Sequence, residues 1–264
     1  MGLESTRFFL ASRTAFLISG DHLKVTVAET NPSVFTYQAS NSTFKVGSAS
    51  AIDHRGYFLT AAHCVKKEAP YLLFGLGRQL QAEPARVVWR GDVSKGEPDL
   101  ALLWVPRTLD RVFEWASDFK AGDQVVAVGP NYHPPFDIKV VCFAGTLNEC
   151  TTRSGIGPRA RSISHNAPLH GGDSGGPLVD LDGRLIAINV RVERTFSFLH
   201  PLGKRLSFAD HPDLPWLYQL IEGHAATQSR AVNQSPNPRS SGDDGVASRL
   251  QVEPVCLAPP DRRR

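Results

Sequence analysis

The sequence predicts an all-β fold in which two antiparallel barrels lie side by side and a short helix ends the folded part. Two observations carry this prediction. Short apolar segments separated by turn residues form two successive series, at about residues 33–118 and 119–210, and no long helical segments alternate with them. After Asp210 the apolar residues recur at helical spacing instead. Two such strand series give two barrels with a cleft between them.

The first series contains six expected strands, rich in β-branched, aromatic and leucine residues. They cover residues 33–37, 45–52, 57–60, 72–74, 85–89 and 100–105. A turn at Asp53–Gly56 joins the second strand to the third, because Asp and Gly favour tight turns. The segment 61–65, directly after the third strand, is expected to form a short helical turn that presents His63.

The second series also contains six expected strands, and one sharp turn divides them. The strands cover residues 124–128, 140–144, 162–165, 177–181, 185–192 and 196–199. The Asp182-Gly183 pair predicts a two-residue hairpin, because such a turn needs the positive φ angles that this dipeptide supplies.

The two ends of the chain read differently. Residues 212–224 predict a helix with Pro212 or Pro215 in its first turn, and residues 225–264 contain too few apolar side chains to offset the entropy of ordering, so we expect a disordered tail. Residues 1–32 form an N-terminal extension. It is either a weak export signal, which Arg13 interrupts, or a strand or helix packed on the first barrel. An exported and a cytoplasmic location both stay open, and no stretch is long and apolar enough to span a membrane.

One serine in the second series has the surroundings of a nucleophile. Ser174 lies between the glycines of His-Gly-Gly-Asp-Ser-Gly-Gly-Pro. A serine hydroxyl is a weak nucleophile at neutral pH and needs a histidine base and an orienting carboxylate. His63 follows Leu-Thr-Ala-Ala, and Asp99 precedes Leu-Ala-Leu-Leu, so the chain order is His, Asp, Ser. Because the first two come from the first series and Ser174 from the second, we expect the triad at the interface of the barrels.

The same serine also satisfies the pattern Gly-x-Ser-x-Gly, with Gly172 and Gly176 as the outer glycines. That pattern in an α/β-hydrolase requires a helix directly after the serine and the order Ser, Asp, His. Here Pro177 and the Asp182-Gly183 hairpin follow instead. The α/β-hydrolase interpretation is therefore excluded.

Three blocks carry a resemblance to a known family. Gly47–His63, Asp99–Leu103 and Gly172–Val179 resemble the trypsin-like (chymotrypsin-fold) serine peptidases, and in particular their HtrA-like bacterial branch, over about residues 33–208. The resemblance implies two six-stranded antiparallel β-barrels with the active site between them, and a peptidase domain over residues 33–224. It also implies a serine endopeptidase that acts on proteins or peptides through an acyl-enzyme intermediate and uses no metal or organic cofactor.

The resemblance implies roles for single residues. His63 is the general base, Asp99 orients its imidazole, and the backbone N–H groups of Gly172 and Ser174 form the oxyanion hole. Pro168 replaces the aspartate that gives trypsin-like members their basic specificity. Val190 and Val192 narrow the substrate pocket, so small or medium aliphatic side chains are expected on the acyl side of the cut bond.

Other properties of the family carry over less directly. Phe8, Phe9 and Phe16 permit the trimer that N-terminal aromatic residues build in HtrA-like relatives, and a monomer is the alternative. No PDZ-like domain fits in residues 225–264. Two rival functions remain, a catalytically silent binding module of the same fold and an esterase that uses the same site.

Composition limits the partners but does not identify them. The formal net charge is +3, from 29 Lys and Arg against 26 Asp and Glu, and no basic stripe suggests a nucleic-acid partner. The histidines show no metal-binding spacing of the His-Glu-x-x-His kind. The four cysteines are read as free thiols, although Cys142 and Cys150 bracket a possible hairpin and would form a cross-strand disulfide in an oxidising compartment.

Overall fold

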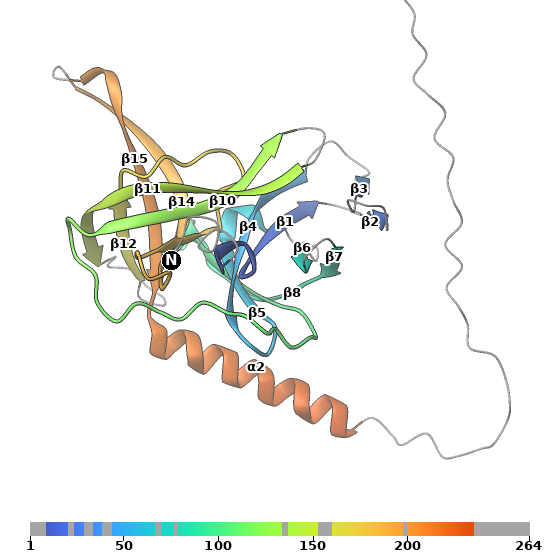
Figure 1. Ribbon diagram of the computed structural model, residues 1–264. Coiled ribbons are helices and arrows are strands. Elements are labelled where there is room, and N and C mark those ends of the chain that lie inside the picture. The colour runs from blue at the N-terminus through green and yellow to red at the C-terminus, as the bar shows by residue number, and fades with distance from the viewer. Residues whose placement is uncertain are drawn as a thin grey trace, which may run out of the picture. The chain divides into compact units, whose positions relative to one another are not determined.

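The computed structural model describes residues 9–20, 24–28, 34–38, 44–66, 70–76, 79–133, 137–152, 160–197 and 200–234. Residues up to Ala225 belong to one compact unit, and a second unit begins at Ala226. Within the described part, two β-sheets and one long helix account for most of the structure (Figure 1). The predicted all-β class is confirmed.

Seven antiparallel strands form the first sheet, in the order β7-β6-β1-β4-β5-β9-β8. They are β1 (Thr14–Gly20), β4 (Phe44–Asp53), β5 (Tyr57–Ala61), β6 (Tyr71–Leu76), β7 (Gln79–Pro84), β8 (Arg86–Arg90) and β9 (Leu100–Trp104). Every residue of β5 and the first four residues of β9 are buried. These two neighbouring strands therefore lie in the hydrophobic core.

The sheet is curled and is not the regular six-stranded barrel that was expected. Its two edge strands, β7 and β8, follow one another in the chain and are separated by Ala85 alone. Pro84 has no N–H to continue a ladder, and the Ala85 N–H donates instead to the Pro70 carbonyl at 2.7 Å. One bent segment thus pairs with β6 through its first half and with β9 through its second half. The strand expected over 33–37 is not part of this sheet, and β1 and β7, which were not expected, bring its strands to seven.

The first sheet begins earlier than the predicted boundary at residue 33. Strand β1 lies between β4 and β6, and all seven of its residues are buried. Of the alternatives for the N-terminal extension, the strand is therefore what the structure shows for residues 14–20. Phe16 is 3% exposed inside this sheet, which leaves it unavailable for contacts with another copy, and Phe8 lies outside the described residues. A separate hairpin joins β2 (Lys24–Ala28) to β3 (Val34–Gln38).

The second sheet is a closed barrel of six strands, as expected, in the order β10-β11-β12-β15-β14-β13. They are β10 (Gln124–His133), β11 (Asp137–Thr152), β12 (Ala160–His165), β13 (Pro177–Val179), β14 (Leu185–Ser197) and β15 (His200–Pro212). The hairpin between β13 and β14 is confirmed, but its turn is not the predicted two-residue turn. The Asp180 N–H donates to the Arg184 carbonyl at 3.0 Å, so Leu181, Asp182 and Gly183 all lie in the loop, with Gly183 at φ 82°. Of the strand expected over 196–199, residues 196 and 197 are the end of β14, and residues 198 and 199 lie outside the described part. Strand β15, which was not expected, completes the barrel.

The C-terminal helix α2 (Leu214–Gln234) begins two residues later than expected and ends ten residues later. Asp213 caps it by accepting a hydrogen bond from the Trp216 N–H at 3.0 Å. Leu217 and Ile221 are fully buried and belong to the same hydrophobic cluster as the first sheet. Residues 225–234 were expected in a disordered tail; they are helical, because alanine, glutamine and arginine favour a helix even without a buried face. Residues 235–264 lie outside the described part, and their disorder stays a prediction.

The possible hairpin between Cys142 and Cys150 does not exist. Both residues lie on the single strand β11, which runs on from its pairing with β10 to its pairing with β12. Eight residues of strand span about 26 Å, far beyond the Cα separation of a disulfide. The structure shows Cys64, Cys142 and Cys150 as free thiols, in agreement with the preferred interpretation. Cys256 lies outside the described residues.

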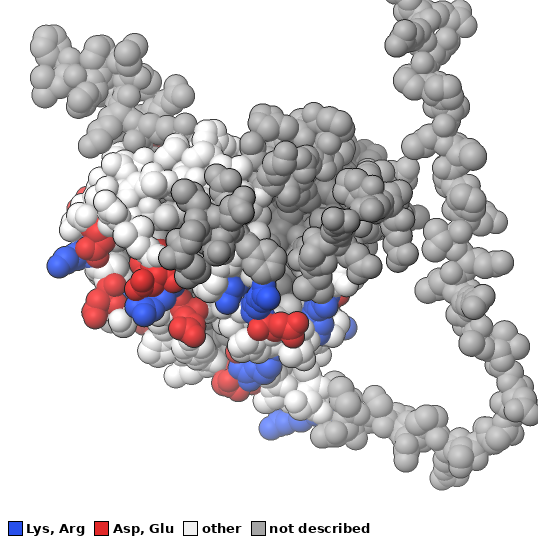
Figure 2. All heavy atoms as spheres, viewed as in Figure 1, with Lys and Arg blue, Asp and Glu red and all other residues white. Residues whose placement is uncertain are grey.

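The described surface carries both signs of charge. On the face in Figure 2, Lys and Arg side chains alternate with Asp and Glu side chains and do not gather in one patch. Among the described helices, none combines the length and apolarity that crossing a membrane requires.

Candidate active site

His63 and Asp99 are neighbours because of how β5 and β9 pair. Ala61, the last residue of β5, lies opposite Leu100, the first residue of β9. The chain leaves β5 into a single 3-10 turn, η1 (Ala62–Cys64), which carries His63, and Asp99 directly precedes β9. The Ala62 N–H donates to the Asp99 carbonyl at 3.1 Å. Two buried strands thus fix the main chain on both sides of this pair.

The side chains of this pair are joined by two hydrogen bonds. Asp99 Oδ1 accepts from the His63 backbone N–H at 2.9 Å, and Asp99 Oδ2 lies 2.7 Å from His63 Nδ1. The carboxylate therefore holds the proton on Nδ1 and leaves Nε2 as the basic nitrogen. This hydrogen bond raises the pKa of the His63 imidazole above its ordinary value, because a nearby carboxylate stabilises the protonated form.

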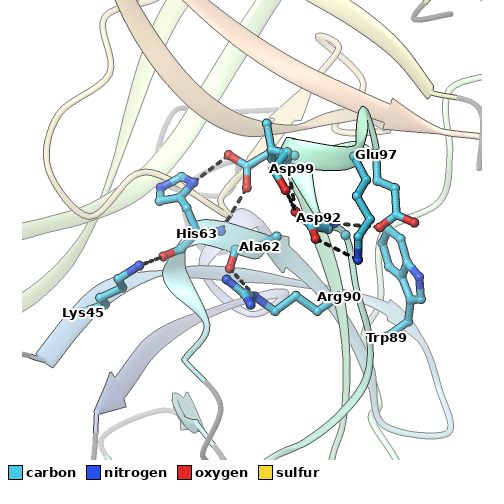
Figure 3. A pocket seen from close by; sticks show the side chains of 12 residues that line it. Lys45, Ala62, His63, Trp89, Arg90, Asp92, Glu97 and Asp99 are labelled. Carbon is cyan, nitrogen blue, oxygen red and sulfur yellow. Dashed lines mark hydrogen bonds and ion pairs between the residues drawn. The ribbon is translucent and has the colours of Figure 1, made fainter. Parts of the chain in front are cut away.

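A polar pocket of about 660 Å³ opens beside His63. Figure 3 shows the imidazole and the Asp99 carboxylate facing one another at its edge, with Lys45 reaching the main-chain carbonyl of His63. The rest of its lining comes mainly from β8 and the loop before β9, with the short 3-10 turn η2 (Val93–Lys95). This loop was not among the predicted site elements.

The loop that carries Ser174 belongs to the second barrel but is attached to the first sheet. Two hydrogen bonds from Ser48 of β4 hold it: the Ser48 N–H donates to the Ser174 carbonyl at 2.7 Å, and the Ser48 hydroxyl donates to the Gly172 carbonyl at 2.8 Å. Ser50 adds a longer bond to the Gly175 carbonyl at 3.3 Å. Cys64 Sγ, next to His63 in the chain, lies 3.8 Å from the Ser174 carbonyl oxygen. The loops that carry His63 and Ser174 therefore meet.

Glycines and one buried carboxylate shape this loop. Gly172 has φ 98°, a conformation that residues with a Cβ rarely adopt. Asp173 is 2% exposed, and its Oδ2 accepts from the His170 N–H at 2.6 Å. A Cβ at Gly129 of β10 would lie 1.9 Å from Asp173 Oδ1, so only glycine permits this close approach.

The nucleophile candidate points at strand β14 in this structure. Ser174 Oγ donates to the Val190 carbonyl at 3.5 Å, and the described part of the chain shows no hydrogen bond from it to His63. Within the same described residues, the backbone N–H groups of Gly172 and Ser174 donate no hydrogen bond. Two donors beside the serine are thus available to a ligand atom.

The predicted pocket residues are dispersed. Pro168 is exposed in the loop before Ser174, and Val190 is 1% exposed within the hydrophobic cluster of the first sheet. Val192 is 38% exposed. The register of β14 against β15 shifts between Asn189 and Arg191, so Val190 lies at a bulge and presents its carbonyl to Ser174. None of the three predicted residues lines the pocket beside His63.

Two contributors were missed at the level of sequence. Ser48 lies in the block that carried the family resemblance, and its alternation with Ser50 on β4 is a signal that two hydroxyls face one side of a strand. Asp210 of β15 accepts a hydrogen bond from the Asp99 N–H, and one carboxylate near the end of a strand gives no such signal. No cluster of three or more potential metal ligands occurs in the described ranges.

Comparison with known proteins agrees with this geometry. The family model for a trypsin-like peptidase domain matches residues 47–188. The chain is 31% identical over 196 residues to serine protease HTR4 of Rattus norvegicus, covering 70% of this chain and 36% of that protein. It is 30% identical over 149 residues to a probable periplasmic DegP-like serine endoprotease of Halomonas elongata, covering 56% of this chain and 29% of that protein. The chain thus spans about a third of the length of these relatives.

Solved structures share the fold at low sequence identity. A serine endoprotease from Yersinia pestis superimposes with a TM-score of 0.58 at 20% identity, covering 84% of this chain and 67% of that one. The Rv3671c protease of M. tuberculosis in its active form gives a TM-score of 0.55 at 19% identity, covering 78% of each chain. At these identities the likeness concerns the fold alone.

Proposed function

Because the chain belongs to the trypsin-like peptidase family, we propose that it is a serine endopeptidase in which Ser174 is the nucleophile, His63 the general base and Asp99 the residue that orients the imidazole. One observation carries the proposal. The His63–Asp99 pair is formed on the first sheet, and hydrogen bonds from Ser48 hold the Ser174 loop of the second barrel against that sheet. These contacts support the proposal, because they hold the main chain of the Ser174 loop beside the turn that carries His63.

The proposed reaction proceeds in two halves. His63 Nε2 takes the hydroxyl proton as Ser174 Oγ bonds to the carbonyl carbon of the substrate, and Asp99 stabilises the imidazolium. The imidazolium then gives its proton to the leaving nitrogen as the carbon–nitrogen bond breaks, which leaves an acyl-enzyme. Water, activated by the same imidazole, releases the acid and restores the serine. To start this cycle, Ser174 Oγ exchanges its bond to the Val190 carbonyl for one to His63.

The negative oxygen of the tetrahedral intermediate needs two donors that are in place beforehand. We assign this role to the N–H groups of Gly172 and Ser174. The positive φ of Gly172 and the hydrogen bond from Ser48 to its carbonyl support the assignment, since both restrict the peptide plane on which the first donor lies.

The chain-specific part of the proposal is its side-chain preference. Pro168 offers no counter-charge to a basic side chain, and the apolar Val190 and Val192 lie on the strand that presents its carbonyl to Ser174. We propose that the enzyme cuts after small or medium aliphatic residues. A library of fluorogenic peptides varied at that position tests this, and a dominant preference for Arg, Lys or Phe would overturn the pocket assignment while leaving the triad unaffected.

The experiment for the function itself compares wild type with Ser174→Ala on a folded protein substrate, a peptide amide and an activated ester. We expect wild type to cut all three and Ser174→Ala to cut none. Hydrolysis of the ester alone would favour the esterase. Absence of hydrolysis and of reaction with an active-site probe would favour the silent binding module, whose fold would be the same.

A further inference from the structure

A second carboxylate lies behind the triad, on the other barrel. Asp210 belongs to β15, opposite Ser162 of β12 and Ile188 of β14. Its side chain is 0% exposed. The reaction proposed above gives it no role.

Asp210 makes a hydrogen bond to the main chain of the triad acid. Its Oδ2 accepts from the Asp99 N–H at 3.0 Å. The carbonyl of Asp99 accepts from the Ala62 N–H at 3.1 Å, next to His63. The two backbone groups of Asp99 are therefore held from opposite sides, one by the histidine turn and one by the second barrel.

A carboxylate is a costly choice for this position. Burying a carboxyl group costs free energy unless hydrogen bonds compensate, and an apolar side chain of similar size would pack there without that penalty. What an apolar side chain cannot do is accept a hydrogen bond from an N–H that the fold has turned inward. We therefore attribute the presence of an aspartate at position 210 to its acceptor oxygen.

We propose that Asp210 is a positioning residue of the triad, which fixes the main chain of Asp99 and through it the direction of the carboxylate that holds His63. The inference rests on the proposed function of the triad. In this proposal the second barrel contributes to the active site twice. It supplies the Ser174 loop, and through Asp210 it positions Asp99.

The expected effect falls on the rate and not on binding. A displacement of about 1 Å in a catalytic group costs on the order of 10²-fold in rate. Asp210 is buried behind Asp99 and contacts no substrate, so KM is expected to stay within about threefold while kcat falls. If the Asp99 carboxylate turns away from His63, it no longer raises the pKa of the imidazole. The acidic limb of the pH–rate profile is therefore expected to move to lower pH.

The experiment compares two replacements at this position in the full chain. Asp210→Asn keeps an oxygen that accepts from the Asp99 N–H, whereas Asp210→Leu removes it. Tyr57→Phe is the matched control for lost stability. Its hydroxyl makes a buried hydrogen bond network with Ile221 and His224, and it lies at the end of β5 away from η1. For each variant kcat, KM, the pH profile and the melting temperature are measured.

We expect Asp210→Leu to lower kcat on the order of 10²-fold with its acidic limb at lower pH, and Asp210→Asn to stay within about fivefold of wild type. Tyr57→Phe is expected to lower the melting temperature without changing kcat. Equal losses in the two Asp210 variants, or a kcat loss that only follows the melting temperature, would overturn the inference. These results are distinguishable from failure of the proposed function, in which wild type itself hydrolyses nothing.

Discussion

Replacing Asp99 by asparagine is the perturbation whose size follows most directly from the geometry. The carboxylate oxygen lies 2.7 Å from His63 Nδ1, so the centres of the two charges are about 4 Å apart when the imidazole is protonated. At an effective dielectric constant of about 20 this attraction contributes about 4 kcal/mol, or about a thousandfold in rate. Asparagine also allows the amide to bond the wrong imidazole tautomer, which raises the expected loss to about 10³–10⁴-fold. Because the His63 side chain is 44% exposed, solvent screens this attraction, and we expect a loss of rate at the lower end of that range.

The assay is kcat/KM for a peptide substrate as a function of pH. His63 must be neutral to accept a proton, and Asp99 raises its pKa, so the acidic limb of wild type is expected above the unperturbed value of about 6.5. In Asp99→Asn the pKa falls toward that value and the limb moves to lower pH, while the plateau drops. Asp182→Asn serves as the control, because Asn-Gly suits the same exposed hairpin turn. An unmoved limb with less than a tenfold loss would refute the reasoning.

Three further changes test the support of the site. Ser48→Ala removes the hydrogen bond from the hydroxyl to the Gly172 carbonyl and is expected to lower kcat about tenfold with little change in KM. An unchanged kcat would show that the Ser174 loop does not depend on this hydrogen bond from β4. Gly47→Ala adds a Cβ that would lie 2.9 Å from the Ser174 carbonyl oxygen and 2.8 Å from Cys64 Sγ, so the Ser174 loop must shift. We expect kcat to fall by about tenfold or more. An unchanged kcat would contradict the close packing of β4 against this loop. Leu217→Ala leaves a cavity at a fully buried position between α2 and the first sheet. It is expected to lower the free energy of unfolding, measured by urea denaturation, by about 2–5 kcal/mol. A loss below about 1 kcal/mol would mean that the helix packs only loosely on the sheet.

The proposed catalytic residues could be selected from the sequence because each has a distinctive local context. Ser174 lies among glycines, His63 follows a short buried strand, and Asp99 precedes another one. Such patterns can be identified from the sequence without knowledge of the fold. The hairpin between β13 and β14 was likewise indicated by the Asp182-Gly183 pair, although its loop is longer than the two-residue turn that this pair predicted.

Elements with mixed signals were missed for identifiable reasons. Strand β1 follows Arg13 and resembles a short export signal, although burial between two neighbours makes it a central strand. Strand β15 begins with Pro201 and Gly203 and continues through Lys204 and Arg205, which reads as a loop until β14 is available as its partner.

Contacts between the barrels could not be derived from sequence at all. The hydrogen bonds from Ser48 to the Ser174 loop and from Asp99 to Asp210 join residues more than a hundred positions apart. Val190, which was expected to narrow a substrate pocket, shows the same limit. A strand pattern indicates which face a residue occupies, but the bulge beside Asn189 changes that face and was visible only in the register of β14.

The central claim is that Ser174 is a nucleophile activated by His63. Mass spectrometry of the protein after reaction with a fluorophosphonate probe tests it most directly, because the probe bonds covalently to an activated serine and the adduct can be placed on one residue. The account predicts a single adduct on Ser174 in wild type, none in Ser174→Ala, and a much slower reaction in His63→Ala. An adduct on another residue, or labelling that persists unchanged in Ser174→Ala, would contradict it.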